Sequence, residues 1–166
     1  MAKIKNPILF STHFGLKPEV MEAAGFVDPF LNVDTQLFID PALLEKSSIE
    51  LIRIEALAAF RKHFDNFLRL LAISECEGDA AWRAAQRLLD LSEPADNGLG
   101  YGGSGRSGSS RPDEIRDAIM RTAKEIVTLG SKDPEMLALM GFFEENVGPD
   151  TISDFTTRVI AGHLAK

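Results

Sequence analysis

The stretch of sequence that decides the fold is residues 49–74, IELIRIEALAAFRKHFDNFLRLLAIS. Its apolar side chains recur at steps of three and four residues, the spacing that places them on one face of an α-helix. The positions on this face are Ile49, Ile52, Ala56, Leu57, Phe60, Phe64, Phe67, Leu68 and Leu71. Arg53 and Arg61 are among the charged residues of the other face, and Ser47 and Ser48 stand where a helix cap is needed. The pattern predicts a long amphipathic helix at the centre of a helical bundle.

Prolines and capping carboxylates mark further helices on both sides of this stretch. Proline suits the first turn of a helix because its φ is helical and its missing N–H would have no partner there. These signals predict helices over residues 18–25, 79–91, 112–129 and 134–146, and a last helix that begins at Asp150. Asp28-Pro29 and Asp40-Pro41 fit the same start signal, a carboxylate cap followed by proline.

Thr35 to Ile39 is the strand candidate, because the run is too short and too apolar to be a helix on its own. It either pairs with residues 4–10 or stays an extended, buried connector. Together the elements predict one mainly α-helical domain over residues 1–166, a bundle of five or six helices with at most one short strand pair and a long Gly/Ser-rich loop. Its parts are a mixed N-terminal segment (1–46), a first helical part (47–96), the loop (97–112) and a second helical part (113–166).

Composition and charge bound the function classes. Of the 166 residues, 45% are hydrophobic and 26% charged, and no apolar run is long enough to cross a membrane. The single Cys76 leaves no internal disulfide and no multi-cysteine zinc site. We therefore expect a soluble, cytoplasmic protein without membrane contact.

The formal net charge of −7 argues against a global electrostatic grip on nucleic acid. The charge is uneven, because residues 1–18, 97–112 and 155–166 contain Lys or Arg and no acid. These three segments would form a cationic patch if they met in space, although solvated faces and termini explain most such runs.

Residues 97–112, NGLGYGGSGRSGSSRP, contain six Gly, four Ser and two Arg. Fixing so many glycines costs backbone entropy, so the segment is either a linker or a loop ordered by something that it binds. Backbone N–H groups of small residues can approach an anion, and the helix that starts at Pro112 would point its positive end at it. The residues of such a phosphate site would be Gly100, Tyr101, Gly102, Gly103, Ser104, Gly105, Arg106, Ser107 and Arg111. No P-loop motif is present, and segments of this composition are more often connectors.

Patterns for catalysis and metal binding are sparse. Asp28, Asp34 and Asp40 recur at six-residue steps, but the last two would lie roughly 20 Å apart in an extended chain, too far to share one metal ion. Helix caps and a turn explain these carboxylates better. There is no His-Glu-x-x-His motif and no pair of cysteines, and we predict neither a metal nor a cofactor.

Arg158 and His163 are the weak catalytic candidates, because they fit the loose Arg-x4–6-His pattern of HEPN ribonucleases, which are also helical bundles. Five residues at 3.6 per turn separate the two side chains by about 140° around a helix. They would converge only if Gly162 ended the helix, and Val159 stands where those enzymes have a polar residue. The alternative is a surface arginine in an ion pair and a histidine near the C-terminal end of the helix dipole.

Three stretches resemble the N-terminal part of larger uncharacterised bacterial proteins: residues 27–41 (VDPFLNVDTQLFIDP), the Gly/Ser segment, and residues 148–157 (GPDTISDFTT). The resemblance covers most of the chain and assigns no catalytic residue. It implies a module that normally continues into, or works beside, a further domain. A role in defence against mobile elements is implied by the kind of protein that the chain resembles, and by no residue of its own.

Missing catalytic motifs and ordered amphipathic helices together favour a non-catalytic protein-interaction or regulatory module. Its partner would be another protein or a C-terminal partner domain, with the Gly/Ser segment as the adaptable contact. The alternatives are binding of a phosphate-bearing ligand, a nucleotide or a nucleic acid through that segment, and an HEPN-like ribonuclease.

Overall fold

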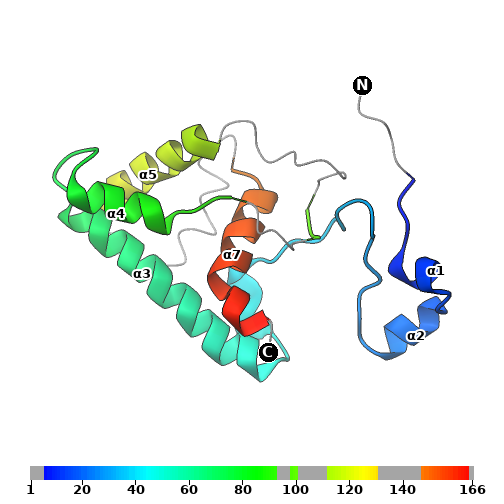
Figure 1. Ribbon diagram of the computed structural model, residues 1–166. Coiled ribbons are helices and arrows are strands. Elements are labelled where there is room, and N and C mark those ends of the chain that lie inside the picture. Colours follow the sequence, from blue (N-terminus) through cyan, green and yellow to red (C-terminus); the bar gives the residue numbers. More distant parts are fainter. Residues whose placement is uncertain (1–5, 93–97, 101–111, 131–146, 165–166) are drawn as a thin grey trace. The chain divides into compact units, whose positions relative to one another are not determined.

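The structure is a computed structural model, and it describes residues 6–92, 98–100, 112–130 and 147–164. The chain divides into two compact units, a first unit of residues 1–38 with 95–110 and a second unit of residues 39–94 with 111–166. In the described ranges both units consist of helices and connecting segments (Figure 1), and the backbone pairs as strands only at two isolated β-bridges. The predicted mainly helical fold is therefore confirmed.

The first unit begins with two short helices, α1 (Phe10–Phe14) and α2 (Pro18–Ala23). α2 starts at Pro18, as predicted. Gly15 at φ 65° and Gly25 at φ 72° follow the two helices in the left-handed region. Glycine adopts this conformation without the steric penalty that a Cβ atom brings, so both residues let the chain turn away from a helix end.

The prediction that Asp28-Pro29 starts a helix is wrong. Residues 26–29 have no helical structure, and the Asp28 carboxylate instead caps α1. Its Oδ1 accepts a hydrogen bond from the Ser11 N–H at 2.9 Å, and its Oδ2 accepts one from the Ser11 hydroxyl at 2.5 Å. The reason is a long-range pairing: Phe10 N–H donates to the Pro29 carbonyl, and Leu9 bridges to Phe30. This pairing holds residues 28–30 extended beside the start of α1.

Thr35 forms a single parallel bridge with Leu99 instead of beginning a strand. The Thr35 N–H donates to the Gly98 carbonyl at 2.8 Å, and the Thr35 carbonyl accepts from the Gly100 N–H at 2.9 Å. The chain then turns at once, because the Leu37 N–H donates back to the Thr35 carbonyl at 2.6 Å. In residues 6–10, the described part of the segment predicted to pair with Thr35, the bridging residue is Leu9 and its partner is Phe30, so this part does not pair with Thr35.

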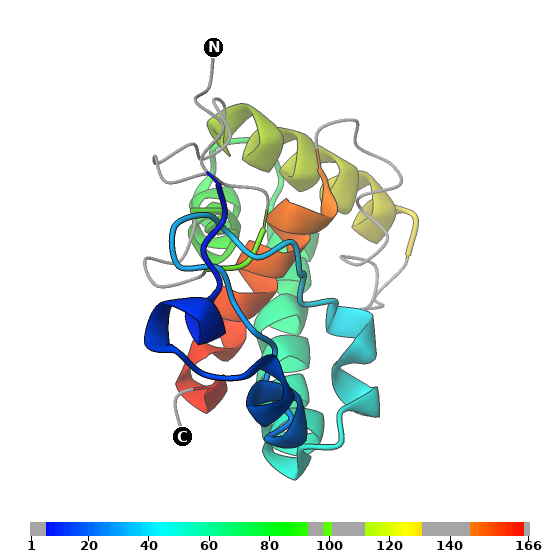
Figure 2. The same ribbon diagram turned by 90° about the vertical axis from the view of Figure 1, so that its right-hand side faces the viewer.

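The second unit contains the remaining described helices. In chain order they are η1 (Pro41–Lys46, a 3₁₀ helix), η2 (Ile52–Ala56, a π-helical turn), α3 (Leu57–Ile73), α4 (Ala80–Leu88), α5 (Pro112–Thr128) and α7 (Pro149–Leu164). The Asp40 carboxylate accepts from the Ala42 N–H at 2.9 Å, so Asp40-Pro41 starts a helix as predicted, although of the tighter 3₁₀ type. Figures 1 and 2 show α7 crossing α3, with α4 and α5 packed toward the C-terminal end of α3.

The predicted long helix is confirmed, with one irregularity near its start. The Ser47 hydroxyl accepts from the Ile49 N–H at 3.2 Å, which is the expected cap. In η2 the Leu57 N–H donates to the carbonyl of Ile52, five residues earlier. The dihedral angles are helical on both sides of this turn, so η2 and α3 form one continuous helix that carries a single π-turn.

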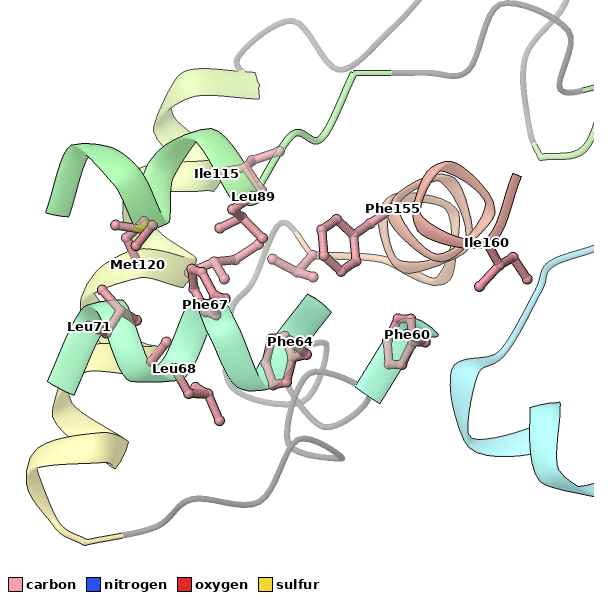
Figure 3. Close-up of a cluster of buried hydrophobic side chains, with 14 of the residues drawn as sticks. Phe60, Phe64, Phe67, Leu68, Leu71, Leu89, Ile115, Met120, Phe155 and Ile160 are labelled. Carbon is pink, nitrogen blue, oxygen red and sulfur yellow. The ribbon is translucent and has the colours of Figure 1, made fainter. Parts of the chain in front are cut away.

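The core of the second unit lies along α3, as the periodicity predicts. Figure 3 shows Phe60, Phe64 and Phe67 following one another on α3, with Phe155 of α7 facing them. The Phe60 and Phe155 rings meet edge to face with centroids 6.3 Å apart, a favourable aromatic arrangement. Three other helices and Leu89, the residue after α4, contribute further buried side chains: Trp82, Ala85, Leu89, Ile115, Ile119, Met120, Ala123 and Ile160. Met120 is the one of these on α5 that the helical spacing did not indicate.

Polar side chains fix the ends of the helices in this unit. The Asp79 carboxylate caps α4 by accepting from the Trp82 N–H at 2.7 Å, and it also accepts from the N–H groups of Glu75 and Cys76. Lys124 donates from Nζ to the carbonyls of Leu71 and Ser74 at 2.8 and 2.6 Å, at the C-terminal end of α3. A cation at this end of a helix is stabilising because it satisfies carbonyls that have no partner within the helix.

The predicted helix over residues 134–146 lies outside the described residues. Within the described ranges, no helix has both the length and the apolar character that crossing a bilayer requires.

Candidate functional site

Of the nine residues predicted to bind an anion, the structure describes Gly100; the other eight, Tyr101 to Ser107 and Arg111, lie outside the described residues. Gly100 is buried, has a φ of 125°, and donates its N–H to the Thr35 carbonyl. That N–H group is therefore used within the first unit. The described part of the predicted site serves to hold the chain beside Thr35.

Arg158 contacts the chain just beyond the end of α4. Its Nη1 lies 3.2 Å from Asp90 Oδ2, and its Nη2 donates to the carbonyl and the hydroxyl oxygens of Ser92, at 2.7 Å in each case. The Ser92 hydroxyl donates in turn to Asp90 Oδ1 at 2.6 Å. Burial by itself would raise the pKa of the Asp90 carboxyl group, but the hydrogen bonds from Ser92 and the charge of Arg158 hold this pKa below its ordinary value. The arrangement joins α7 to the segment that follows α4.

His163 lies on the same helix and has a different partner. α7 continues through Gly162 to Leu164, so the helix end that a convergence with Arg158 requires is not formed at Gly162. The Nδ1 atom of His163 lies 3.6 Å from Oε2 of Glu55, in the π-turn η2. The structure thus directs Arg158 toward Asp90 and Ser92, and His163 toward Glu55.

Among the described side chains no three His, Cys, Asp or Glu residues gather closely enough to hold a metal ion. Asp40 caps η1, the role that the sequence predicted for it, whereas Asp28 binds Ser11 at the start of α1 and not a helix of its own.

The first unit presents a surface that sequence reasoning missed. Every residue from 12 to 27 is exposed except Met21, which is half-buried. We call residues 12–27 the exposed segment. Its large apolar side chains are open to solvent, with exposed fractions of 57% for Phe14, 68% for Phe26 and 61% for Val27. Among the described residues of the first unit no apolar side chain is buried, whereas Ser11, Thr35 and Gly100 are.

Polar contacts, and not an apolar core, set the shape of this segment. α1 has five residues and α2 has six, so neither is long enough to present a continuous apolar stripe. The Asp28 carboxylate holds α1 through its two hydrogen bonds with Ser11. The Leu16 N–H donates a hydrogen bond to the Ser11 carbonyl at 2.8 Å. The Phe10 and Phe14 rings lie 4.6 Å apart, but this contact leaves Phe14 more than half exposed.

The charges around these side chains are mostly negative. Glu19 and Glu22 lie one turn apart on α2, both exposed, and neither forms an ion pair within the described ranges. The basic residues of the segment are Lys17 and His13. The sequence held one usable signal for this surface: Phe14, Leu16, Val20, Phe26 and Val27 fall between helix-ending glycines and a proline, in pieces too short to form a buried face.

Comparison with known proteins identifies a family. The family model described as "Domain of unknown function (DUF8370)" matches residues 15–166, which include nearly all of the exposed segment and the whole second unit. No curated protein and no solved structure matches the chain.

Proposed function

The chain belongs to the DUF8370 family, and we propose that it is a non-catalytic protein-interaction module whose contact surface includes the exposed segment, residues 12–27. The sequence favours the same function, with the Gly/Ser segment as the contact to a partner. In this proposal the exposed segment is a second contact surface beside it.

The observation that carries the proposal is the difference between the two units. The second unit buries its large apolar residues, among them Phe64, Leu71 and Ile119, which are fully enclosed. The first unit leaves Phe14, Val20, Phe26 and Val27 more than half exposed. Removing a large apolar side chain from water is worth about 1.5–3 kcal/mol, so a partner that covers several of these side chains gains a large driving force. Scattered exposed apolar residues are normal, but a run of chain that gathers them is typical of an interaction site.

The backbone of the segment supports the same reading. Its turns are fixed by Gly15 and Gly25 and by the cap from Asp28 to Ser11, so the apolar side chains project from a defined backbone. A surface whose backbone is already ordered loses less conformational entropy on binding than a disordered one.

The resemblance to larger bacterial proteins suggests what kind of partner the chain has. In this proposal the chain works beside a further protein or domain, in a bacterial assembly that we propose acts in defence. A phosphate site in the Gly/Ser segment and an HEPN-like ribonuclease stay predictions from the sequence.

The test compares two double variants of the full chain as bait in a lysate of the source organism. Phe14→Ser/Phe26→Ser removes two apolar side chains of the exposed segment, whereas Ile73→Ser/Leu129→Ser removes two exposed apolar side chains of the second unit, with exposed fractions of 69% and 87%. We expect the first variant to lose the protein that the wild type captures and the second to keep it, with both melting as the wild type does. Equal capture by the two variants would contradict the proposal.

A further inference from the structure

Resting on the proposed function, we infer that Asp28 is the residue that positions the exposed segment for its partner, because it closes a loop that buries no apolar side chain of its own. The exposed segment begins directly after Ser11 and ends directly before Asp28. Hydrogen bonds between residues 6–11 and residues 28–32 join these two ends. We call this set of hydrogen bonds the clasp.

The centre of the clasp is a short antiparallel pairing of the backbone. The Phe10 N–H donates to the Pro29 carbonyl at 2.8 Å, and the Leu31 N–H donates to the Ile8 carbonyl at 2.9 Å. The side chain of Asn32 extends the pairing at the end that lies away from the loop. These contacts bring together parts of the chain that the whole exposed segment separates.

Asp28 makes the contacts of the clasp that lie nearest to the loop. Its two carboxylate oxygens accept from the N–H and the hydroxyl of Ser11, at 2.9 and 2.5 Å. Ser11 is buried, and its carbonyl accepts from the Leu16 N–H inside the exposed segment. Loss of the Asp28 carboxylate would therefore act first on the start of α1 and on the loop that follows it.

The clasp is polar, which makes the loop less stable than the core of the second unit. Among the described residues of the first unit no apolar side chain is buried, and the hydrogen bonds described for residues 6–32 all join residues of this unit. Hydrogen bonds that replace bonds to water contribute little net stability. Regions with few buried apolar contacts open at a lower free energy than the core does. We therefore expect residues 10–29 to open and close while the second unit stays folded.

Opening of the loop would disturb the proposed contact surface directly. Phe14 lies three residues after Ser11, and Phe26 lies two residues before Asp28. The clasp thus fixes the separation of these two exposed side chains. A partner that contacts both of them binds the closed loop better than the open one, so its apparent affinity falls with the fraction of closed molecules.

Hydrogen exchange of the full chain, followed by NMR, tests the clasp. In the wild type we expect the N–H groups of Phe10 and Leu16 to exchange faster than those of the buried part of α3. Asp28→Ala removes both acceptors and should speed exchange of these two groups about tenfold or more, with the α3 amides within about twofold of the wild type. Asp34→Ala is the matched control, since this carboxylate of the same unit has no hydrogen bond in the described ranges.

The lysate experiment of the proposed function supplies a second measurement, with the protein that the wild type captures as the probe. Asp28→Ala should capture about a tenth as much or less, and Asp34→Ala as much as the wild type. Asp28→Asn should restore most of the capture and slow exchange again, because an amide can accept from the Ser11 N–H and donate to the Ser11 hydroxyl.

Unchanged exchange in Asp28→Ala would overturn the inference, and so would faster exchange throughout the second unit, because the loop would then not open by itself. Asp28→Asn that behaves as Asp28→Ala does would overturn it too. If Asp28→Ala opens the loop and keeps the captured protein while Phe14→Ser/Phe26→Ser loses it, the positioning role is wrong and the proposed surface stands. If Phe14→Ser/Phe26→Ser keeps the protein, the proposed function fails, and with it the role of Asp28 in binding.

Discussion

Arg158 of α7 donates from one nitrogen, Nη2, to both the carbonyl and the hydroxyl oxygen of Ser92, 66 residues earlier in the chain. The same guanidinium group lies within 3.2 Å of Asp90. The contact therefore holds the segment that follows α4 against α7. A planar group with several donors suits this geometry, which the ammonium group of a lysine cannot reproduce.

The first prediction follows from that geometry. Arg158→Lys keeps the positive charge but loses the paired donors, so we expect a loss of about 1–2 kcal/mol in the free energy of unfolding, at the low end for charged hydrogen bonds because the group is partly exposed. Urea denaturation monitored by circular dichroism measures the loss. Arg69→Lys is the control, since Arg69 pairs with Asp65 on an exposed face and should change stability by less than about 0.5 kcal/mol. If Arg158→Lys unfolds at the same urea concentration as the wild type, the positive charge alone provides the stabilisation and the paired donors add nothing.

The second prediction concerns acid stability and Asp79. The hydrogen bond from the Trp82 N–H is the main cause that lowers the pKa of this carboxyl group from 3.8 to about 2, against the opposing effect of desolvation, and the N–H groups of Glu75 and Cys76 add to it. Because the folded-state pKa is depressed, the stabilisation is fully present above about pH 4 and is lost as the pH falls through about 2.

Asp79→Asn should therefore lower the melting temperature by a few degrees at neutral pH. An Asn side chain has one acceptor oxygen for Trp82, and its NH2 group would then face the N–H groups of Glu75 and Cys76, which now donate to the second carboxylate oxygen. The difference from the wild type should shrink as the pH falls from about 4 to about 2. Calorimetric melting curves across this range provide the measurement, with Glu77→Gln as an exposed control in the same turn. A difference that stays constant down to pH 2 would contradict the capping role.

The third prediction tests the core along α3. Phe64 is fully buried and packs between the rings of Phe60 and Phe67, at centroid distances of 6.5 and 5.3 Å. Phe64→Ala should cost about 3–5 kcal/mol, because it removes apolar contacts and leaves a cavity. Leu129→Ala is the matched control, since Leu129 is 87% exposed and its truncation should cost less than about 0.5 kcal/mol. Similar unfolding midpoints for the two variants would contradict the described packing.

The fourth prediction isolates the lysine that binds the end of α3. Lys124→Met keeps the length of the side chain but removes the hydrogen bonds to the carbonyls of Leu71 and Ser74, so we expect a loss of about 1–3 kcal/mol. Lys62→Met, on the exposed face of α3, should be close to neutral. Hydrogen exchange adds a local measurement, because the amides near the C-terminal end of α3 should lose protection in Lys124→Met alone. Unchanged exchange there would mean that the bonds do not stabilise this end.

The helices of the second unit were largely predictable. Helical periodicity and capping are local properties, so the stretch 49–74 predicted η2 and α3, and Asp79 and Pro112 predicted the starts of α4 and α5. The π-turn was not predictable from this pattern. A single wider turn hardly changes the spacing of the apolar residues along the sequence, so the pattern looks like that of a regular helix.

The first unit was predicted less well, for a physical reason that Asp28 illustrates. A carboxylate before a proline caps whichever N–H groups lie closest, and at Asp28 those belong to Ser11, 17 residues earlier. Thr35 likewise pairs with Leu99 because the chain returns there, not because of its own neighbours. The exposed segment was missed for the same reason. A short run of apolar residues in a sequence does not show whether distant parts of the chain cover these side chains.

The bounds of η2 and α3, the starts of α4 and α5, and the buried faces of these helices were determined by the sequence itself, because each depends on neighbours within about four positions. The tertiary structure alone decided that Arg158 binds Ser92, that Asp28 caps α1, and that Phe14 and Phe26 stay exposed. These three outcomes depend on which distant segments meet, and on which do not, and packing settles that only when the whole chain folds.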